Sequence, residues 1–106
     1  MKKILITGGL GLIGSSIAKK IMRDGYEVTI IDNKSTNITS KIESAEIIEA
    51  DVTNYEQLKQ IKLRNVDTIL HLAGQSSGPK SFEVPYQDVR DNVLGTINAL
   101  KFCGLN

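Results

Sequence analysis

The stretch KILITGGLGLIG, residues 3–14, decides how this chain folds. It opens with a short, β-branched apolar run at 3–7, which predicts a strand buried on both faces. A glycine-rich turn follows, and the next segment has the pattern of a helix over 12–24. Residues 27–32 (Glu-Val-Thr-Ile-Ile-Asp) return to the pattern of a strand. The chain therefore begins with one strand–helix–strand unit of about the usual 30 residues.

Apolar side chains recur at helical spacing within the predicted helix. Ile13, Ile17 and Ile21 stand four residues apart, which places them on one stripe facing the core. Gly25 stands where a glycine commonly ends a helix in the left-handed conformation.

The rest of the chain continues the alternation of strands and helices. Strands are expected at 46–50 and 66–72, and polar loops at 33–44 and 75–85. The spacing from Thr53 to Glu56 is that of a capping box, which predicts a short helix carrying Leu58 and Ile61. A last helix is expected from Tyr86 to Cys103, ending at Gly104, with its core face formed by Val89, Val93, Ile97 and Leu100.

Strands that alternate with helices predict a parallel sheet with right-handed crossovers. The fold class is α/β, a Rossmann-type doubly wound parallel sheet with the strand order 3-2-1-4. Nothing resembles a repeat or a linker, so residues 1–106 are expected to form one domain.

Composition excludes several classes of protein. The 106 residues carry 13 Lys+Arg against 12 Asp+Glu, and the resulting net charge of +1 argues against a nucleic-acid-binding surface. No apolar run approaches the roughly 18 residues that span a bilayer, and no secretion signal is expected. The single cysteine, Cys103, is expected to be buried, and it fits a reducing cytoplasm. His71, the single histidine, has no partners at metal spacing, so no metal site is expected, and it is interpreted as a strand-end packing residue.

The glycines between the first strand and the first helix are typical of a phosphate-binding turn. A tight turn lets a pyrophosphate approach backbone N–H groups, and the positive end of the helix dipole favours the phosphates. Two registers fit, one through Gly9, Gly11 and Gly14 and one through Gly8, Gly11 and Gly14. The glycines alone do not choose between them, and both predict a dinucleotide site.

Asp32 ends the second strand, 18 residues after Gly14, close to the spacing of a ribose-binding acid. A carboxylate there accepts hydrogen bonds from both adenosine-ribose hydroxyls and repels a 2′-phosphate, which favours NAD over NADP. Lys34 would soften that preference but lacks the bidentate fork of arginine. The competing interpretation is a solvated carboxylate at the end of a strand.

Five motifs in order resemble one family. Thr7 to Gly14 matches Thr-Gly-Gly-x-Gly-x-Ile-Gly, and Asp32 to Thr36 is similar to the Asp-Asn-Leu-Ser-Thr of UDP-hexose 4-epimerases. The other three are Asp51-Val52, the His-x-Ala-Ala/Gly segment from His71 to Gln75, and Pro85 followed by Asn92-Val93-x-Gly95-Thr96. Together they resemble the extended short-chain dehydrogenase/reductases, the NAD-dependent epimerase/dehydratases of nucleotide sugars. Leu10 and Leu12 depart from the family, which often has Ala or Ser and then Phe or Tyr there.

The resemblance implies an NAD-binding domain at the N-terminus of a longer enzyme that transfers a hydride from and to a sugar carbon. It selects the register of Gly8, Gly11 and Gly14 and implies contacts to the adenine from Asp51 and Val52. The residues that it implies around NAD are Gly8, Gly11, Leu12, Ile13, Gly14, Asp32, Asn33, Lys34, Ser35, Thr36, Asn37, Asp51, Val52, Leu72, Ala73, Gly74, Gln75, Ser76 and Asn92.

No residue of this chain is assigned a catalytic role. The Ser/Thr and Tyr-x-x-x-Lys of the family follow a fifth strand, beyond the match, so residues 1–106 alone are expected to be inactive. Tyr55 and Lys59 match Tyr-x-x-x-Lys by letter, but they fall on the adenosine side. Asp88 and Asp91 are interpreted as a solvated helix face.

Two other functions stay open: a non-enzymatic, NAD-responsive regulatory module, and a shortened gene product without activity. Self-association is expected through 66–72 or the last helix, because the fourth strand would be an unprotected apolar edge.

Overall fold

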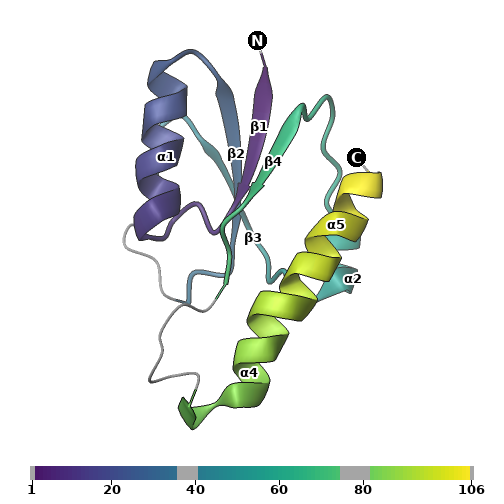
Figure 1. Cartoon of the computed structure of the whole chain (residues 1–106). Coiled ribbons are helices and arrows are strands. Elements are labelled where there is room, and N and C mark those ends of the chain that lie inside the picture. Colours follow the sequence, from purple (N-terminus) through teal and green to yellow (C-terminus); the bar gives the residue numbers. More distant parts are fainter. Residues whose placement is uncertain (1, 36–40, 75–81, 106) are drawn as a thin grey trace.

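The computed structural model describes residues 2–35, 41–74 and 82–105 and shows one four-stranded parallel sheet (Figure 1). The strand order β3-β2-β1-β4 confirms the predicted topology. The strands are β1 (Lys3–Thr7), β2 (Glu27–Asp32), β3 (Glu46–Glu49) and β4 (Thr68–His71). Only β4 differs much from prediction, since it begins two residues later and ends one residue earlier.

The register brings the carboxyl ends of the strands to one edge of the sheet. Thr7, the last residue of β1, is paired with Ile31 on one side and His71 on the other. Asp32, the last residue of β2, is paired with Glu49. Side chains from four separate segments therefore meet at this edge.

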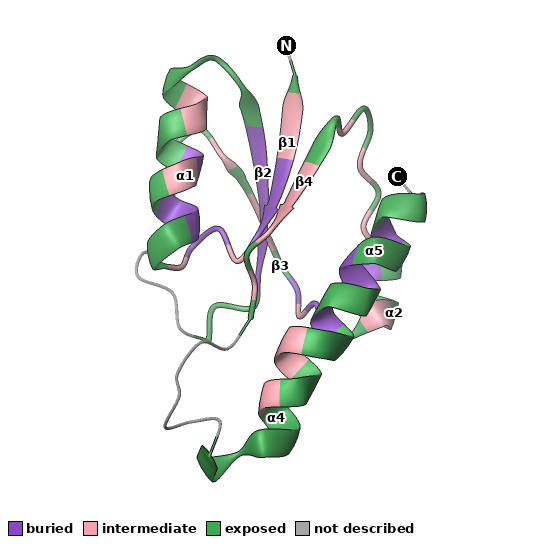
Figure 2. Ribbon diagram, in the orientation of Figure 1, coloured by how far each residue is buried: buried purple, intermediate pink, exposed green. Residues whose placement is uncertain are grey.

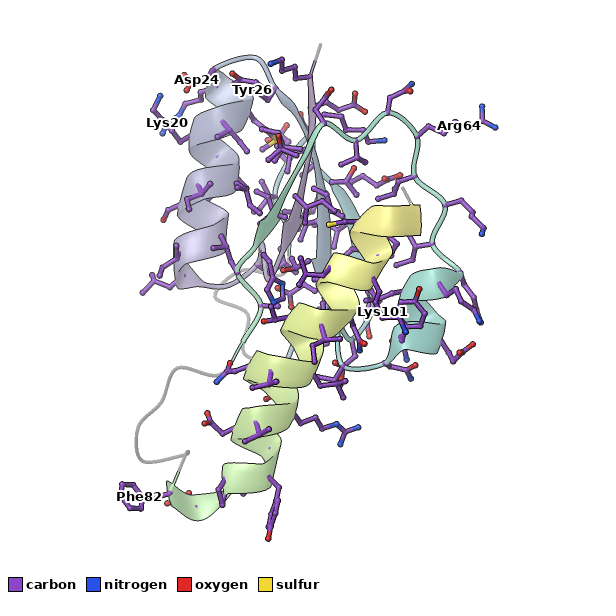
Figure 3. All side chains as sticks on the ribbon, turned by 45° about the vertical axis from the view of Figure 1, so that its right-hand side comes forward. Lys20, Asp24, Tyr26, Arg64, Phe82 and Lys101 are labelled. Atoms are coloured by element: carbon purple, nitrogen blue, oxygen red, sulfur yellow. The ribbon has the colours of Figure 1, made fainter. Side chains whose placement is uncertain are left out.

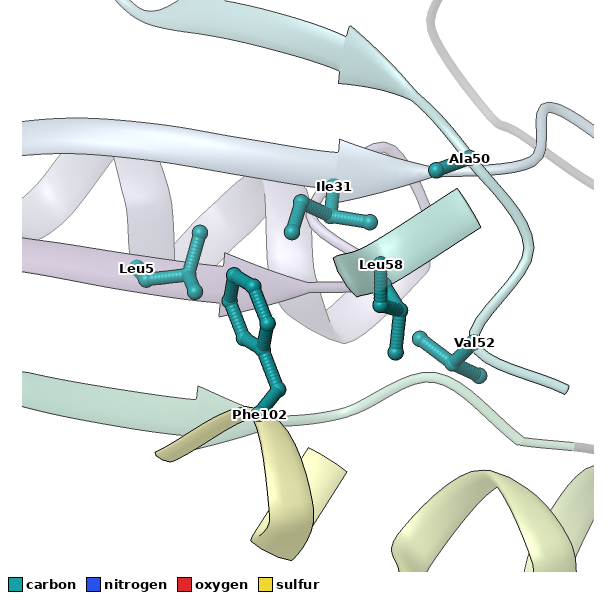
Figure 4. Packing of buried hydrophobic residues seen from close by; sticks show 6 residues of the cluster. All are labelled: Leu5, Ile31, Ala50, Val52, Leu58 and Phe102. Atoms are coloured by element: carbon teal, nitrogen blue, oxygen red, sulfur yellow. The ribbon is translucent and has the colours of Figure 1, made fainter. Parts of the chain in front are cut away.

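Alternate residues of the inner strands enter two separate hydrophobic clusters, one on each face of the sheet. Leu5 and Ile31 pack with Phe102 in one cluster (Figure 4), whereas Ile6 and Ile30 belong to the other. Because a strand points successive side chains to opposite faces, a strand covered on both faces is apolar throughout. This explains the unbroken apolar runs of β1 and β2.

Helix α1 (Leu12–Arg23) covers one face of the sheet, and the left-handed Gly25 (φ +95°) follows its end as predicted. The N–H groups of Gly25 and Tyr26 bond to the carbonyls of Met22 and Ile21, the pattern of a Schellman motif. The predicted stripe is only partly correct. Ile17 and Ile21 pack against the core, but Ile13 is 65% exposed because the first turn of α1 borders a cleft instead of the sheet.

The short helix α2 (Tyr55–Lys59) lies on the opposite face, and its cap differs from prediction. Asn54, not Thr53, is the N-cap, and its side-chain oxygen accepts from the N–H of Gln57 at 3.2 Å. The hydroxyl of Thr53 is used elsewhere, because it donates to the Asp51 carboxylate at 2.7 Å. Leu58 is buried as expected, whereas Ile61 follows the helix.

The last helix is continuous but not uniform. It consists of α4 (Pro85–Val89), a π-helical turn η1 (Arg90–Leu94) and α5 (Gly95–Leu105), so it starts one residue earlier than predicted and continues past Gly104. Cys103, expected to be buried, is exposed.

The predicted core face of this helix is wrong (Figure 2). Val89, Val93, Ile97 and Leu100 are 58%, 53%, 48% and 68% exposed. The buried stripe is instead Gly95, Asn98, Ala99 and Phe102. Small residues allow the helix to approach closely: a Cβ at Gly95 would lie 3.0 Å from Val52, and the Asn98 amide donates to the Val52 carbonyl at 2.8 Å. Within the described residues, no helix is long and apolar enough to cross a membrane.

Candidate cofactor site

A cleft of about 360 Å³ opens at the carboxyl ends of the strands, above β1 and its neighbours β2 and β4. The chain runs to β2 on one side of β1 and later returns to β4 on the other. Ligands of open α/β sheets bind where the connections diverge in this way. The lining residues are Gly8, Gly11, Leu12, Ile13, Gly14, Ile31, Asp32, Asn33, Ser35, Ala50, Asp51, Val52, Thr53, Leu72, Ala73, Gly74 and Asp91.

The backbone conformation distinguishes the two glycine registers. Gly8 has φ +73°, and a Cβ there would lie 2.7 Å from the backbone nitrogen of Ala73. A Cβ at Gly14 would overlap the carbonyl oxygen of Gly8. Gly9 faces away from the cleft, because its Cβ would meet the side chain of Ile30 at 2.7 Å. The glycines of this turn that border the cleft are therefore Gly8, Gly11 and Gly14.

Gly11 differs from the other two because the fold makes no demand for a glycine there. Its backbone is extended (φ −77°, ψ −177°), and an added Cβ would meet only the Gly8 carbonyl oxygen, at 3.4 Å, an ordinary contact. It is the N-cap of α1, where unpaired N–H groups and the helix dipole favour an anion. Space kept free beside a helix N-terminus is the geometry that a pyrophosphate needs.

Asp32 is buried, with 9% of its surface exposed, and its carboxylate ties two segments together. Oδ2 accepts from the N–H of Leu10 at 3.0 Å, and Oδ1 accepts from the N–H of Lys34 at 2.7 Å. This rules out the interpretation of a solvated strand-end carboxylate. A carboxylate offers about four lone-pair positions, so two remain for ligand hydroxyls.

The segment after Asp32 turns sharply. Lys34 has φ +62°, and the Asn33 side chain accepts from the N–H of Ser35 at 3.0 Å. The ammonium group of Lys34 lies 3.6 Å from the Glu49 carboxylate, and Lys34 does not line the cleft. Of the predicted site residues in this segment, Thr36 and Asn37 lie outside the described residues.

Asp51 and Val52 form the wall that follows β3. Asp51 accepts from both the N–H and the hydroxyl of Thr53, at 2.8 and 2.7 Å, and its own N–H donates to the Gln57 side chain at 2.8 Å. Val52 is held by Asn98 of α5. These hydrogen bonds hold Asp51 and Val52 in their orientation at the cleft without any contribution from a ligand.

The opposite wall, Leu72–Gly74, follows β4 and lies over Gly8. A Cβ at Gly74 would be 2.7 Å from the Asn92 side-chain oxygen, so the last helix contacts this wall from behind. Asn92 itself does not line the cleft, whereas Asp91 does. Sequence reasoning missed Asp91 and treated it like Asp88, because which side chain faces the cleft depends on the π turn. The predicted Gln75 and Ser76 lie outside the described residues.

Most predicted contacts with described positions come together here. Those that line the cleft are Gly8, Gly11, Leu12, Ile13, Gly14, Asp32, Asn33, Ser35, Asp51, Val52, Leu72, Ala73 and Gly74. Lys34 and Asn92 do not, and Ile31, Ala50, Thr53 and Asp91 were not anticipated. Leu10 and Leu12, the two departures from the family pattern, lie in different environments. Leu10 is fully buried, whereas Leu12 is 70% exposed and lines the cleft.

Tyr55 and Lys59, which match Tyr-x-x-x-Lys by letter, do not line the cleft. The ring of Tyr55 lies under the ammonium group of Lys101, 4.0 Å from the ring centroid (Lys101 is labelled in Figure 3). Lys59 pairs with Glu56 at 3.4 Å. No group of three His, Cys, Asp or Glu side chains is placed to hold a metal among the described residues.

Comparison with known proteins identifies the family. The profile of the NAD-dependent epimerase/dehydratase family matches residues 4–106. The chain belongs to this family. NAD is the cofactor in the family's description, and the free space at Gly11 and the acceptor positions of Asp32 fit it.

Curated relatives and solved structures agree with this assignment. UDP-glucuronic acid decarboxylase 1 of Danio rerio is 37% identical over 105 residues, which are 93% of this chain and 24% of its own length. The UDP-glucose 4-epimerase of Brucella ovis, solved with NAD, superposes with a TM-score of 0.89 at 30% identity, over 99% of this chain and 33% of that one. The Thermotoga maritima enzyme, solved with UDP-glucose, gives 0.87 at 31% identity, over 94% and 33%.

The chain spans about a third or less of the length of these proteins. Both the predicted family and the predicted fold are confirmed. The relatives are enzymes, and their names place nucleotide sugars among the molecules on which the family acts.

Proposed function

We propose that residues 1–106 are the NAD-binding domain of a nucleotide-sugar epimerase or dehydratase. One observation carries the proposal: Gly11 lines the cleft at the N-terminus of α1, and the fold itself has no need of a glycine there. The Gly8–Gly14 turn then holds the pyrophosphate, Asp32 accepts from the adenosine ribose, and Asp51 and Val52 flank the adenine. The Leu72–Gly74 segment borders the remainder of the cofactor.

The substrate is proposed from the relatives. When bound, NAD supplies a hydride acceptor that oxidises a sugar carbon and later returns the hydride. UDP-glucose in the Thermotoga maritima structure supports a nucleotide sugar as substrate. The single, exposed Cys103 fits a reducing compartment, and we propose the cytoplasm.

Residues 1–106 are expected to bind NAD without turning over a nucleotide sugar. Transfer of a sugar hydroxyl proton needs an acid or base of suitable geometry and pKa. Among the described residues that line the cleft, the titratable side chains are the carboxylates of Asp32, Asp51 and Asp91. Asp32 and Asp51 are proposed to bind the adenosine part of NAD, and Asp91 is assigned no catalytic role. Calorimetry should therefore show binding of NAD, while UDP-glucose incubated with the chain and NAD stays unchanged. Turnover that Tyr55→Phe abolishes would contradict both this expectation and the non-catalytic role of Tyr55, and absence of NAD binding would contradict the proposed function.

We also propose that the chain self-associates through the outer face of the last helix. Val93, Ile97 and Leu100 lie on the side of α5 and η1 opposite the buried stripe of Gly95, Asn98, Ala99 and Phe102. A helix that is apolar on both sides is normally covered on both sides. Phe82, 94% exposed, lies three residues before the first residue of α4, near the same end of the molecule (Figure 3). The β4 edge supports the proposal less, because Ile69 and Leu70 each pack into one of the two hydrophobic clusters.

Light scattering at micromolar concentration should therefore give a mass above 11.6 kDa. Ile97→Lys should return the mass to that of the monomer, because a charge on the outer face opposes apolar association. Lys19→Glu, a charge change on exposed α1, is the control and should leave the mass unaltered. A wild-type monomer that persists as concentration rises would overturn the proposal. Ile69→Lys, otherwise an obvious choice for the β4 edge, would instead disrupt the core.

A further inference from the structure

His71, at the carboxyl end of β4, lies between two threonine hydroxyls. Its Nδ1 is 2.7 Å from Oγ1 of Thr7, and its Nε2 is 3.3 Å from Oγ1 of Thr96. Thr7 is its register partner on β1, and Thr96 is in the first turn of α5. The imidazole therefore links the edge of the sheet to the last helix.

The bonds of Thr7 assign the protonation of Nδ1. Oγ1 of Thr7 accepts from the N–H groups of Leu72 at 3.1 Å and Ala73 at 3.3 Å. A hydroxyl has two acceptor lone pairs and one proton. With both lone pairs occupied, Thr7 donates its proton to His71, so Nδ1 is the unprotonated nitrogen.

The bonds of Thr96 lead independently to the same tautomer. Its hydroxyl donates to the backbone carbonyl of Asn92 at 2.6 Å. The proton between Thr96 and His71 must therefore come from Nε2 of the imidazole. The bonds of Thr7 and of Thr96 therefore both assign a neutral histidine with its proton on Nε2. In this arrangement Thr7 donates to His71, His71 donates to Thr96, and Thr96 donates to the Asn92 carbonyl.

This arrangement bears directly on the cleft. The same Thr7 hydroxyl that donates to His71 holds the N–H of Ala73, in the Leu72–Gly74 wall. That wall lies against Gly8, where even a Cβ would come within 2.7 Å of the Ala73 nitrogen. A small displacement of the wall would alter the space beside the phosphate-binding turn.

We infer that His71 is a positioning residue of the cofactor cleft, whose neutral form holds the Leu72–Gly74 wall and whose protonation releases it and weakens NAD binding. The inference rests on the proposed NAD site. A protonated imidazole carries a hydrogen on Nδ1 and cannot accept from Thr7. The Thr7 hydroxyl would then have to accept from His71 and give up the N–H of Leu72 or Ala73. The bond from the Ala73 N–H, at 3.3 Å, is longer than the bond from the Leu72 N–H, at 3.1 Å, and is therefore the weaker of the two. The N–H of Leu72 also bonds to the Thr7 carbonyl at 3.0 Å, so loss of the hydroxyl would leave Leu72 with an acceptor and Ala73 with none among the described residues.

Charged neighbours do not dominate the titration. The charged residues on the elements around His71 are Lys3 on β1, Asp67 before β4, Asp88 on α4, Arg90 and Asp91 on η1, and Lys101 on α5. Among the described residues none forms an ion pair with His71, and burial lowers its pKa below the ordinary value of about 6.5. Since the unfolded chain then binds the proton more readily, the free energy of unfolding falls as the pH drops below about 6.5.

Nuclear magnetic resonance of the chain without NAD tests the arrangement directly. His71 is the single histidine, so its side-chain nitrogen signals need no further assignment. We expect Nε2–H and unprotonated Nδ1 at neutral pH and a His71 pKa below about 6.5. We also expect the Ala73 amide to lose protection as His71 becomes protonated, measured as the ratio of the intrinsic to the observed exchange rate at each pH. A proton on Nδ1, or an Ala73 amide indifferent to the titration, would overturn the inference.

Calorimetry with NAD tests the consequence for binding. We expect the dissociation constant to rise about tenfold between pH 7.5 and pH 5, within the usual range of coupling between sites. His71→Asn, whose side-chain oxygen can accept in place of Nδ1 without titrating, should bind NAD with little pH dependence. Thr7→Val should bind weakly at every pH, and Thr7→Ser should restore binding.

The two proposals fail in different ways. If wild-type chain binds NAD equally well on both sides of the His71 titration, the positioning role is wrong while the NAD site stands. If NAD does not bind at any pH, the proposed function is wrong, and the tautomer and the Ala73 amide still decide whether His71 holds the wall.

Discussion

Gly14→Ala is expected to lower the free energy of unfolding by about 3 kcal/mol, at the upper end of the usual cost of overpacking. The new methyl group would overlap the Gly8 carbonyl oxygen and approach the Cα of Gly9 to 2.8 Å. Both are backbone atoms, so no rotamer change relieves the overlap. The gain of about 1 kcal/mol from placing alanine in a helix only partly offsets this cost. Thermal unfolding followed by circular dichroism should show a transition lowered by more than about 10 °C.

Gly11→Ala is the matched control, because it adds the same methyl group three residues earlier. Its extended backbone suits any residue, and the nearest atom would be 3.4 Å away. Its free energy of unfolding should fall by no more than about 1 kcal/mol, the usual cost of placing alanine at an N-cap, and so by much less than in Gly14→Ala. Its affinity for NAD should fall at least tenfold, or about 1.4 kcal/mol, because the methyl group occupies space beside the helix N-terminus.

The pair of variants separates fold from ligand. Equal loss of stability in both would mean that Gly11 serves the fold, and the observation that carries the proposed function would lose its force. A Gly11→Ala variant that is both stable and fully able to bind NAD would place the pyrophosphate elsewhere.

The wild-type chain is expected to bind NAD at least tenfold more tightly than NADP. Asp32 has two lone-pair positions left after bonding to Leu10 and Lys34, and a hydrogen bond to a charged group contributes about 1.5–3 kcal/mol. A 2′-phosphate removes one hydroxyl donor and places like charges together. Lys34 gives little compensation, since its ammonium group is near Glu49.

Asp32→Asn is a sharper test than Asp32→Ala. Alanine would leave the N–H groups of Leu10 and Lys34 without their acceptor, which confuses loss of the turn with loss of the ribose contact. Asparagine keeps one oxygen, so we expect the free energy of unfolding to fall by about 1–2 kcal/mol and the preference for NAD to narrow. Calorimetry with both cofactors and a denaturant titration measure the two effects.

Asp24→Asn serves as the control for charge. It removes the same charge from an exposed side chain that pairs with Lys20 at 2.7 Å, far along α1 from the glycine turn (Figure 3). The preference for NAD should be unaffected. Equal affinities of the wild type for NAD and NADP would show that Asp32 does not bind the hydroxyl groups of the adenosine ribose.

Local sequence patterns were enough to predict the sheet. The β-branched runs of β1 and β2, the glycines between them and the helical spacing from Ile17 to Ile21 all act over a few residues, and they specify the first crossover. The order 3-2-1-4 is that of a mononucleotide-binding half of a doubly wound fold, which the alternation of elements together with the glycine turn indicated. The position of Asp32 at the end of β2 also followed directly.

The tertiary structure decided which side chains face each other across long stretches of chain. Nothing local distinguishes Gly8 from Gly9 until Ala73 lies over one and Ile30 over the other. The core face of the last helix depends on Asn98 reaching Val52, 46 residues away, and its apolar residues were assigned to the wrong side because their spacing suits either face. The tautomer of His71 likewise exists only where β1, β4 and α5 meet. The spacing of apolar residues indicates that a helix has an apolar face. Which segment packs against that face is determined only when segments distant in the sequence come close together.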